Sequence, residues 1–121
     1  MKKIGLTAVV NMRTHPDKIP KGIQLRMLHL PTTDWTPPSL DDLKSGVKFI
    51  SEEIEQGGKV LVHCHWGVGR AVTMGAAYLI STGLSVDDSL AKIRSVRPFI
   101  APNSAQVNRL KEFEKIIKVS D

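Results

Sequence analysis

Cysteine is almost absent from this sequence of 121 residues, because Cys64 is the only one. A single cysteine excludes a disulfide within the chain, and this composition is typical of proteins in a reducing compartment. We therefore expect a cytoplasmic location. Hydrophobic residues make up 41% and charged residues 24% of the chain. These are ordinary values for a soluble globular protein, and the length suits one compact domain.

Long hydrophobic runs are missing as well. No apolar stretch approaches the roughly 20 residues that span a bilayer, so we expect no membrane span. Residues 1–13, MKKIGLTAVVNMR, carry two lysines and a short apolar stretch, but no clear cleavage site follows. We interpret residues 4–10 as a buried strand rather than a signal sequence. The sequence also lacks repeats and interdomain linkers, which predicts one domain over residues 1–121.

The two signs of charge are unequal, with a formal net charge of +5 and a pI of about 9.6. This excess favours anionic partners such as phosphates, nucleic acid or acidic lipid, without choosing among them. An excess of lysine that only maintains solubility is an equally good explanation. Nucleic-acid binding would rest on charge alone, for example on Arg94, Arg97 and Arg109. We therefore expect no stable complex with nucleic acid, and we expect a monomer.

Strands and helices alternate in the hydrophobic pattern. Strands are predicted at residues 6–10, 23–30 and 59–63, the last as the clearest. Apolar residues at helical spacing predict helices over residues 40–54 and 70–82, and then from Ser85 and from Asn103. Ser39 and Asn103 suit N-cap positions, and Gln106 is placed for a capping box. This order predicts an α/β fold, with a central, mostly parallel sheet flanked by helices.

The single cysteine lies in the stretch 63-HCHWGVGRA-71, between a predicted strand and a predicted helix. A glycine-containing loop at a helix start can bind an oxyanion through its backbone N–H groups. Gly67 and Gly69 permit backbone angles that other residues resist, and Arg70 can grip two oxygens of a phosphate. The field that binds a phosphate also stabilises a thiolate. Cys64 is therefore placed to attack a bound phosphate monoester.

A reaction of this kind also needs an acid and base, and Asp34 is the candidate. It follows the second predicted strand, in a loop that contains Pro31, Pro37 and Pro38. Loops after parallel strands gather at the same edge of a sheet, so Asp34 can face Cys64. Its neighbour Trp35 would anchor the loop or form a wall of the pocket. Alternatively, Asp34 only caps backbone groups of a turn.

The His-Cys-x5-Arg stretch, with its two glycines, resembles the signature of cysteine-dependent protein phosphatases. The upstream Asp34 loop and the tail 97-RPFIAPNSAQVNRLKEFE-114 resemble the dual-specificity branch of that superfamily, so that the resemblance covers roughly residues 6–118. It implies that Cys64 is the nucleophile, Arg70 the phosphate clamp and Asp34 the general acid and base. The phosphate-binding loop would comprise His65, Trp66, Gly67, Val68 and Gly69. His63 would position Cys64, and no metal or other cofactor is expected.

Two features differ from this family. Ala71 stands where the family usually has Ser or Thr, whose hydroxyl steadies the cysteine as it leaves phosphate. Thr73 does not obviously replace it, because two residues correspond to a turn of about 200° in a helix. We therefore predict slow breakdown of the phosphoenzyme. Family members also usually carry a strand and a helix before the segment equivalent to residues 6–11, so we expect a smaller sheet with an exposed edge.

The resemblance leaves the substrate open. The loop has no lysine between Cys64 and Arg70, which favours phosphotyrosine or phosphoserine and phosphothreonine over a polyphosphorylated inositol. However, 70-RAVTMGAAYLI-80 also resembles the phosphatidylglycerophosphate phosphatase branch, so a phospholipid monoester is an alternative. An RNA 5′-phosphatase belongs to the same fold family.

Three other interpretations of the loop do not require turnover. Cys64 taken alone fits an inert core cysteine. A metal site would need His63 and His65 together with Cys64, but Cys64 points the other way if the strand continues. A phosphate-binding module with little activity is the third, and Ala71 favours it.

Overall fold

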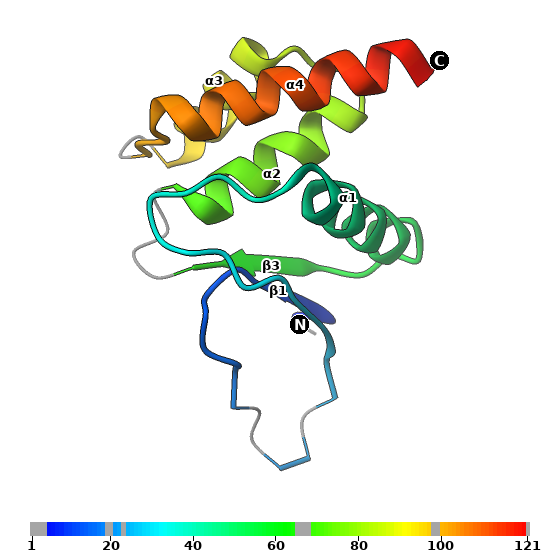
Figure 1. The fold of residues 1–121 in the computed structure, drawn as a ribbon. Coiled ribbons are helices and arrows are strands. Elements are labelled where there is room, and N and C mark those ends of the chain that lie inside the picture. The colour runs from blue at the N-terminus through cyan, green and yellow to red at the C-terminus, as the bar shows by residue number, and fades with distance from the viewer. Residues whose placement is uncertain (1–4, 19–20, 23, 65–68, 98–99, 121) are drawn as a thin grey trace.

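The computed structural model describes residues 5–18, 21–22, 24–64, 69–97 and 100–120. Within them the elements follow in the order β1, β2, α1, β3, α2, α3 and α4 (Figure 1). The strands are β1 (Ala8–Asn11), β2 (Arg26–His29) and β3 (Val60–His63). The helices are α1 (Leu40–Glu55), α2 (Arg70–Ser81), α3 (Val86–Val96) and α4 (Ser104–Ser120). The predicted order of strands and helices is therefore confirmed.

The three strands form a parallel sheet in the order β2-β1-β3. Asn11 lies opposite both His29 and His63, so the three strands end at the same edge. The predicted α/β fold with a parallel sheet is confirmed. The first strand begins two residues later than predicted, because Leu6 lies outside the pairing and its side chain is 47% exposed. Its apolar character therefore did not indicate burial.

Helix α2 is the central helix of the fold. It contacts α1, α3 and α4 as well as β3. Figure 1 shows the described helices on one side of the sheet, with α3 and α4 beyond α2, and the β1–β2 connection extending from the other side. Ala76 and Ala77 are fully buried in α2, and these small side chains let its neighbours approach. The packing around α2 therefore fixes the start of this helix relative to the edge of the sheet.

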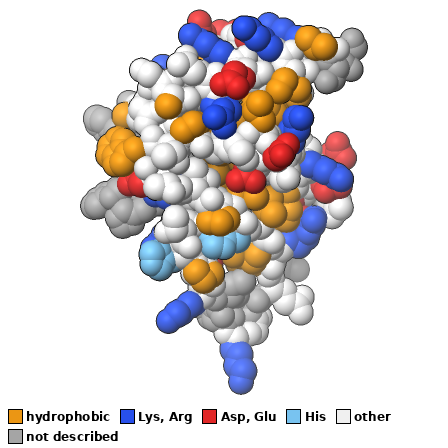
Figure 2. Space-filling view, viewed as in Figure 1, with side chains coloured by type: hydrophobic (Ala, Val, Ile, Leu, Met, Phe, Trp, Pro, Cys, Tyr) orange, Lys and Arg blue, Asp and Glu red, His pale blue; other side chains and the backbone are white. Residues whose placement is uncertain are grey.

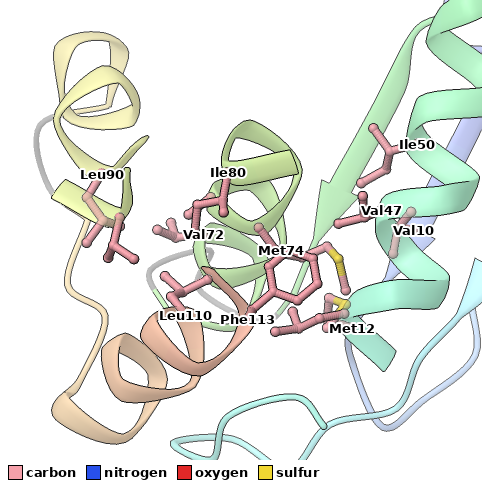
Figure 3. Packing of buried hydrophobic residues seen from close by; sticks show 14 of the residues in the cluster. Val10, Met12, Val47, Ile50, Val72, Met74, Ile80, Leu90, Leu110 and Phe113 are labelled. Carbon is pink, nitrogen blue, oxygen red and sulfur yellow. The ribbon is translucent and has the colours of Figure 1, made fainter. Parts of the chain in front are cut away.

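One hydrophobic cluster joins the helices to the sheet (Figure 3). Val10 comes from β1, Met74 and Ile80 from α2, and Leu110 and Phe113 from α4. Each of these side chains is at most 2% exposed, and burying one contributes roughly 1.5–3 kcal/mol. The C-terminal helix is therefore an integral part of the core.

The predicted helix caps are present. Ser39 Oγ accepts a 3.0 Å hydrogen bond from the N–H of Asp42 and caps α1. Asn103 and Gln106 exchange two hydrogen bonds of 2.9 Å, each from a backbone N–H to the other's side-chain oxygen, so the capping box of α4 is confirmed. Gly83, with φ 115, follows the end of α2. These local signals fix where α1, α2 and α4 begin or end.

Charges of both signs are interspersed on the face of the molecule that Figure 2 shows, so basic side chains do not gather there. Arg109 is not a free basic side chain, because it hydrogen-bonds the carbonyl of Pro38 and lies 3.7 Å from a Glu112 carboxylate oxygen. A basic face over α3 and α4 would therefore lack one of its three predicted arginines. No helix in the described part of the chain is long and apolar enough to cross a bilayer.

Candidate active site

Cys64 directly follows β3, and its sulfur lies at the start of α2. Its side chain is partly buried, and Sγ accepts a 3.3 Å hydrogen bond from the backbone N–H of Ala71. The first N–H groups of a helix have no partner within the helix and carry partial positive charge. This contact therefore places the sulfur at the start of α2, as the sequence predicted. His65, Trp66, Gly67 and Val68 lie outside the described residues.

Gly69 caps α2, but not for the reason that the sequence suggested. Its φ of −128 is accessible to any residue, so a permissive backbone angle is not what requires glycine there. Space is the constraint instead, since a Cβ would lie 2.8 Å from Gln106 Oε1 and 2.9 Å from Nε2. The absence of a side chain at Gly69 lets the end of the loop pack against buried Gln106.

Arg70 is buried and reaches the loop that carries Asp34. Only 4% of its side chain is exposed, and Nη1 donates a 2.8 Å hydrogen bond to the carbonyl of Thr32. Nε lies 3.6 Å from Asp34 Oδ1, and this buried nitrogen has no hydrogen-bond partner among the described residues. The structure thus brings together two of the three predicted catalytic side chains. Buried Nε is a donor available to an oxyanion.

Asp34 itself lies in a loop that α4 holds in place. Three side chains on α4 and at its cap donate hydrogen bonds to backbone carbonyls of this loop: Asn103 to Trp35 (2.8 Å), Gln106 to Thr36 (3.4 Å) and Arg109 to Pro38 (2.6 Å). They recur every third residue, so they share one face of the helix. Sequence reasoning identified Asn103 and Gln106 only as a helix cap. Their spacing with Arg109 was the signal that could have indicated this second role.

Trp35 has a backbone conformation that bulky residues rarely adopt, with φ 68. Asp34 Oδ1 accepts a 3.0 Å hydrogen bond from its N–H, and Asn103 binds its carbonyl. Its side chain is 71% exposed, so it does not anchor the loop by burial. The backbone of Trp35, rather than its indole ring, fixes the turn next to Asp34.

The family model that matches the chain is the catalytic domain of dual specificity phosphatases, over residues 1–116. The chain belongs to this family. It is 33% identical to the dual specificity protein phosphatase Mpk3 of Drosophila melanogaster over 98% of its own length. It is 38% identical to the phosphatidylglycerophosphatase and protein-tyrosine phosphatase 1 of Homo sapiens over 80% of its length.

This dual specificity phosphatase domain also superimposes on a solved structure, PTPMT1 in complex with PI(5)P. The TM-score is 0.87 at 30% identity, over 95% of this chain and 80% of that one. The chain spans only 30% of the Drosophila relative and 49% of the human one. The similarity therefore covers a catalytic domain rather than the whole of these relatives.

His63, the residue before the proposed nucleophile in this dual specificity phosphatase domain, has a carboxylate partner. Its Nε2 donates a 2.8 Å hydrogen bond to Asp17 Oδ2, from the loop after β1. This pairing orients the imidazole, as a positioning role requires. The described residues contain no group of three side chains that could hold a metal ion. Neither sequence spacing nor pattern linked Asp17 to His63, which lies 46 positions later.

The hydroxyl of Thr73 is already used, as its separation from Ala71 suggested. It donates a 2.7 Å hydrogen bond to the carbonyl of Gly69, within the first turn of α2. Among the described residues the Cys64 sulfur accepts a hydrogen bond from a backbone N–H, and none from a hydroxyl. Thr73 therefore does not replace the hydroxyl that Ala71 lacks.

Proposed function

We propose that this domain hydrolyses phosphate monoesters on proteins through a phosphocysteine intermediate, without a metal ion. One observation carries the proposal: Cys64 Sγ accepts a hydrogen bond from the N–H of Ala71, at the start of a helix whose first residue is Arg70. Membership of the dual specificity phosphatase family supports it. A cytoplasmic location and a monomeric state stay predictions from the sequence.

In the first step the Cys64 thiolate attacks phosphorus, forming an S–P bond as the bond from phosphorus to the leaving oxygen breaks. Asp34 gives its proton to that oxygen, and Arg70 with the loop N–H groups stabilises the charge on the other oxygens. In the second step water attacks phosphorus and gives a proton to Asp34, and the S–P bond breaks. The products are an alcohol or phenol, inorganic phosphate and the regenerated thiolate.

Hydrolysis of para-nitrophenyl phosphate with EDTA present tests this proposal. We expect activity in the parent, none in Cys64→Ser, and a parent chain that carries one additional phosphoryl group after acid quenching. Activity that survives in Cys64→Ser would overturn it. No hydrolysis together with tight phosphate binding would instead indicate a phosphate-binding module.

A phospholipid monoester is the second candidate substrate. The human phosphatidylglycerophosphatase and protein-tyrosine phosphatase 1 is 38% identical over 80% of the chain, and PTPMT1 was solved with PI(5)P bound. Comparing kcat/KM for phosphatidylglycerophosphate in mixed micelles with that for phosphotyrosine peptides separates the two. A preference for the lipid above roughly tenfold, or 1.4 kcal/mol, would make it the main substrate.

A further inference from the structure

A pocket of about 390 Å³ extends the site beyond the residues that the proposed reaction needs. Asp34 and Arg70 line it together with Thr33. The rest of its lining comes from the loop after β1, which contributes Arg13, Thr14 and His15. All six of these side chains are polar. None of the three β1-loop residues has a part in the phosphoryl transfer.

Hydrogen bonds from two neighbouring strands hold this loop in shape. Asn11 is fully buried at the end of β1, and its side chain bridges two residues of the loop. Its Oδ1 accepts from the N–H of Arg13 and its Nδ2 donates to the carbonyl of His15, both at 2.8 Å. His29 Nε2 donates a 2.6 Å hydrogen bond to the Arg13 carbonyl. The backbone under Arg13 and His15 is therefore fixed before any ligand binds.

The charges of the pocket favour an anion. In the described structure Arg13 forms no ion pair with a carboxylate, and the one side-chain hydrogen bond of the His15 ring is with the Thr14 hydroxyl, at 3.3 Å. The buried Nε of Arg70 lies 3.6 Å from Asp34 Oδ1 but has no hydrogen-bond partner among the described residues. Asp34 is the single carboxylate in the lining, and in the proposed reaction it carries a proton when substrate binds. A substrate therefore meets Arg13, His15 and two threonine hydroxyls beside its phosphate.

We propose that Arg13 and His15 form a subsite for a second anionic group of the substrate, next to the phosphate that is hydrolysed. The substrate is then a phosphopeptide with an acidic or second phosphorylated residue beside its phosphorylated residue. This inference rests on the proposed function and adds which phosphopeptides the domain prefers. A carboxylate or phosphate suits the planar donor fork of Arg13.

A protein substrate fits the surroundings better than a membrane lipid. The large hydrophobic side chains exposed on the described residues are Leu6, Trp35, Ile54, Leu61, Val96 and Val119. Of these, Trp35 alone belongs to a loop that lines the pocket. This ring, the one large hydrophobic side chain exposed on those loops within the described residues, offers little surface to a bilayer, whereas it can pack against a peptide beside the phosphorylated residue.

A set of phosphotyrosine peptides tests this subsite. The reference peptide has alanine at every position next to the phosphotyrosine, and each of the others has one glutamate at one of those positions. We expect glutamate in at least one position to raise affinity for Cys64→Ser and kcat/KM for the parent roughly fivefold. Arg13→Ala should abolish that preference and Arg13→Lys should restore part of it. Arg94→Ala removes the same charge from an exposed site on α3 and should leave the preference intact.

Binding to Cys64→Ser does not depend on turnover, so the subsite is tested even if the proposed reaction fails. No preference for any acidic peptide would overturn the subsite. The subsite would also be overturned if Arg13→Ala lost affinity for acidic and neutral peptides equally. If the domain preferred the water-soluble glycerophosphate headgroup of a phospholipid and showed no preference for acidic peptides, the proposed peptide substrate would be wrong and a lipid would replace it.

Discussion

The side-chain amide of Asn103 donates a 2.8 Å hydrogen bond to the backbone carbonyl of Trp35, across 68 positions of the sequence. Trp35 follows the proposed general acid, Asp34, and its own N–H binds Asp34 Oδ1. The cap of α4 therefore has two tasks. It starts the last helix, and it holds the turn that orients the acid.

Asn103→Ser separates these two tasks, because serine is an equally good helix cap but is too short to reach Trp35. We expect the free energy of unfolding to fall by no more than about 1 kcal/mol, because the hydrogen bond to Trp35 is lost while the helix cap is kept. Loss of one hydrogen bond of about 1 kcal/mol should lower kcat/KM roughly fivefold for substrates with poor leaving groups. Alkyl and aryl phosphates of graded leaving-group pKa would measure this. The neighbouring change Ser104→Ala, at an exposed position, is the control, and an equal effect there would contradict the anchoring role.

Asp34→Asn tests the general acid. A carboxyl group donates a proton only while it is protonated, so activity of the parent falls as rising pH deprotonates it. Asparagine has no carboxyl proton to donate at any pH, so this dependence on pH should disappear in the variant. We expect kcat to fall by roughly 10²- to 10⁴-fold with alkyl phosphates, and the basic limb of the pH profile to flatten.

Asp41→Asn makes the same change at an exposed position in the first turn of α1 and should leave the pH profile as it is. If Asp34→Asn kept the basic limb of the parent, the acid would be another residue, and Asp17 would be the next to test. Asp17 already binds His63, so its replacement should act on the orientation of that ring.

Ala71→Ser tests whether the missing hydroxyl slows the second step. The backbone N–H of Ala71 contacts the Cys64 sulfur, so a hydroxyl on the same residue lies close to the leaving thiolate. We expect a burst of para-nitrophenol in the parent and a smaller burst with faster steady turnover in Ala71→Ser. Ala91→Ser, on the exposed side of α3, should keep the parent's burst. A parent without a burst would show that breakdown of the phosphoenzyme is not limiting.

Phe113→Ala tests whether α4 is part of the core. Phe113 is 1% exposed and packs within the main cluster, so its truncation should destabilise the protein by about 3–5 kcal/mol. Val119, on the same helix, is 85% exposed, and Val119→Ala should change stability by less than about 0.5 kcal/mol. Urea denaturation of both variants measures the difference. Equal midpoints would mean that α4 contributes little to folding.

Periodicity and caps predicted the fold because both are local. The helix starts at Ser39, Ser85 and Asn103 follow from side chains that bind backbone N–H groups three residues ahead. The parallel sheet followed from the alternation of strands and helices. The strand limits were less accurate, because Leu6 is as apolar as a buried residue and lies outside the pairing.

The site was predicted in part for a similar reason. Cys64, Arg70 and Asp34 lie after strand ends or at a helix start, and topology brings such positions together; their roles stay predictions. The partners that hold them could not be predicted in the same way. Asp17 binds His63 across 46 positions, and Asn103 binds the Asp34 loop across 68. Such pairings depend on the tertiary arrangement, which no local pattern records. The one feature of the sequence that could have indicated a role for Arg13 is its place shortly after a buried strand.

The attachment of the Asp34 loop to α4 has a practical consequence for detecting damage to this protein. The hydrogen bonds that hold the loop come from Asn103, Gln106 and Arg109, at the start of α4, whereas the Cys64 sulfur is held by the N–H of Ala71 at the start of α2. Local opening at the start of α4 would therefore impair proton donation before it disables the thiolate. A chromogenic ester whose leaving group needs no proton would still turn over, and preparations with an impaired acid would pass as intact.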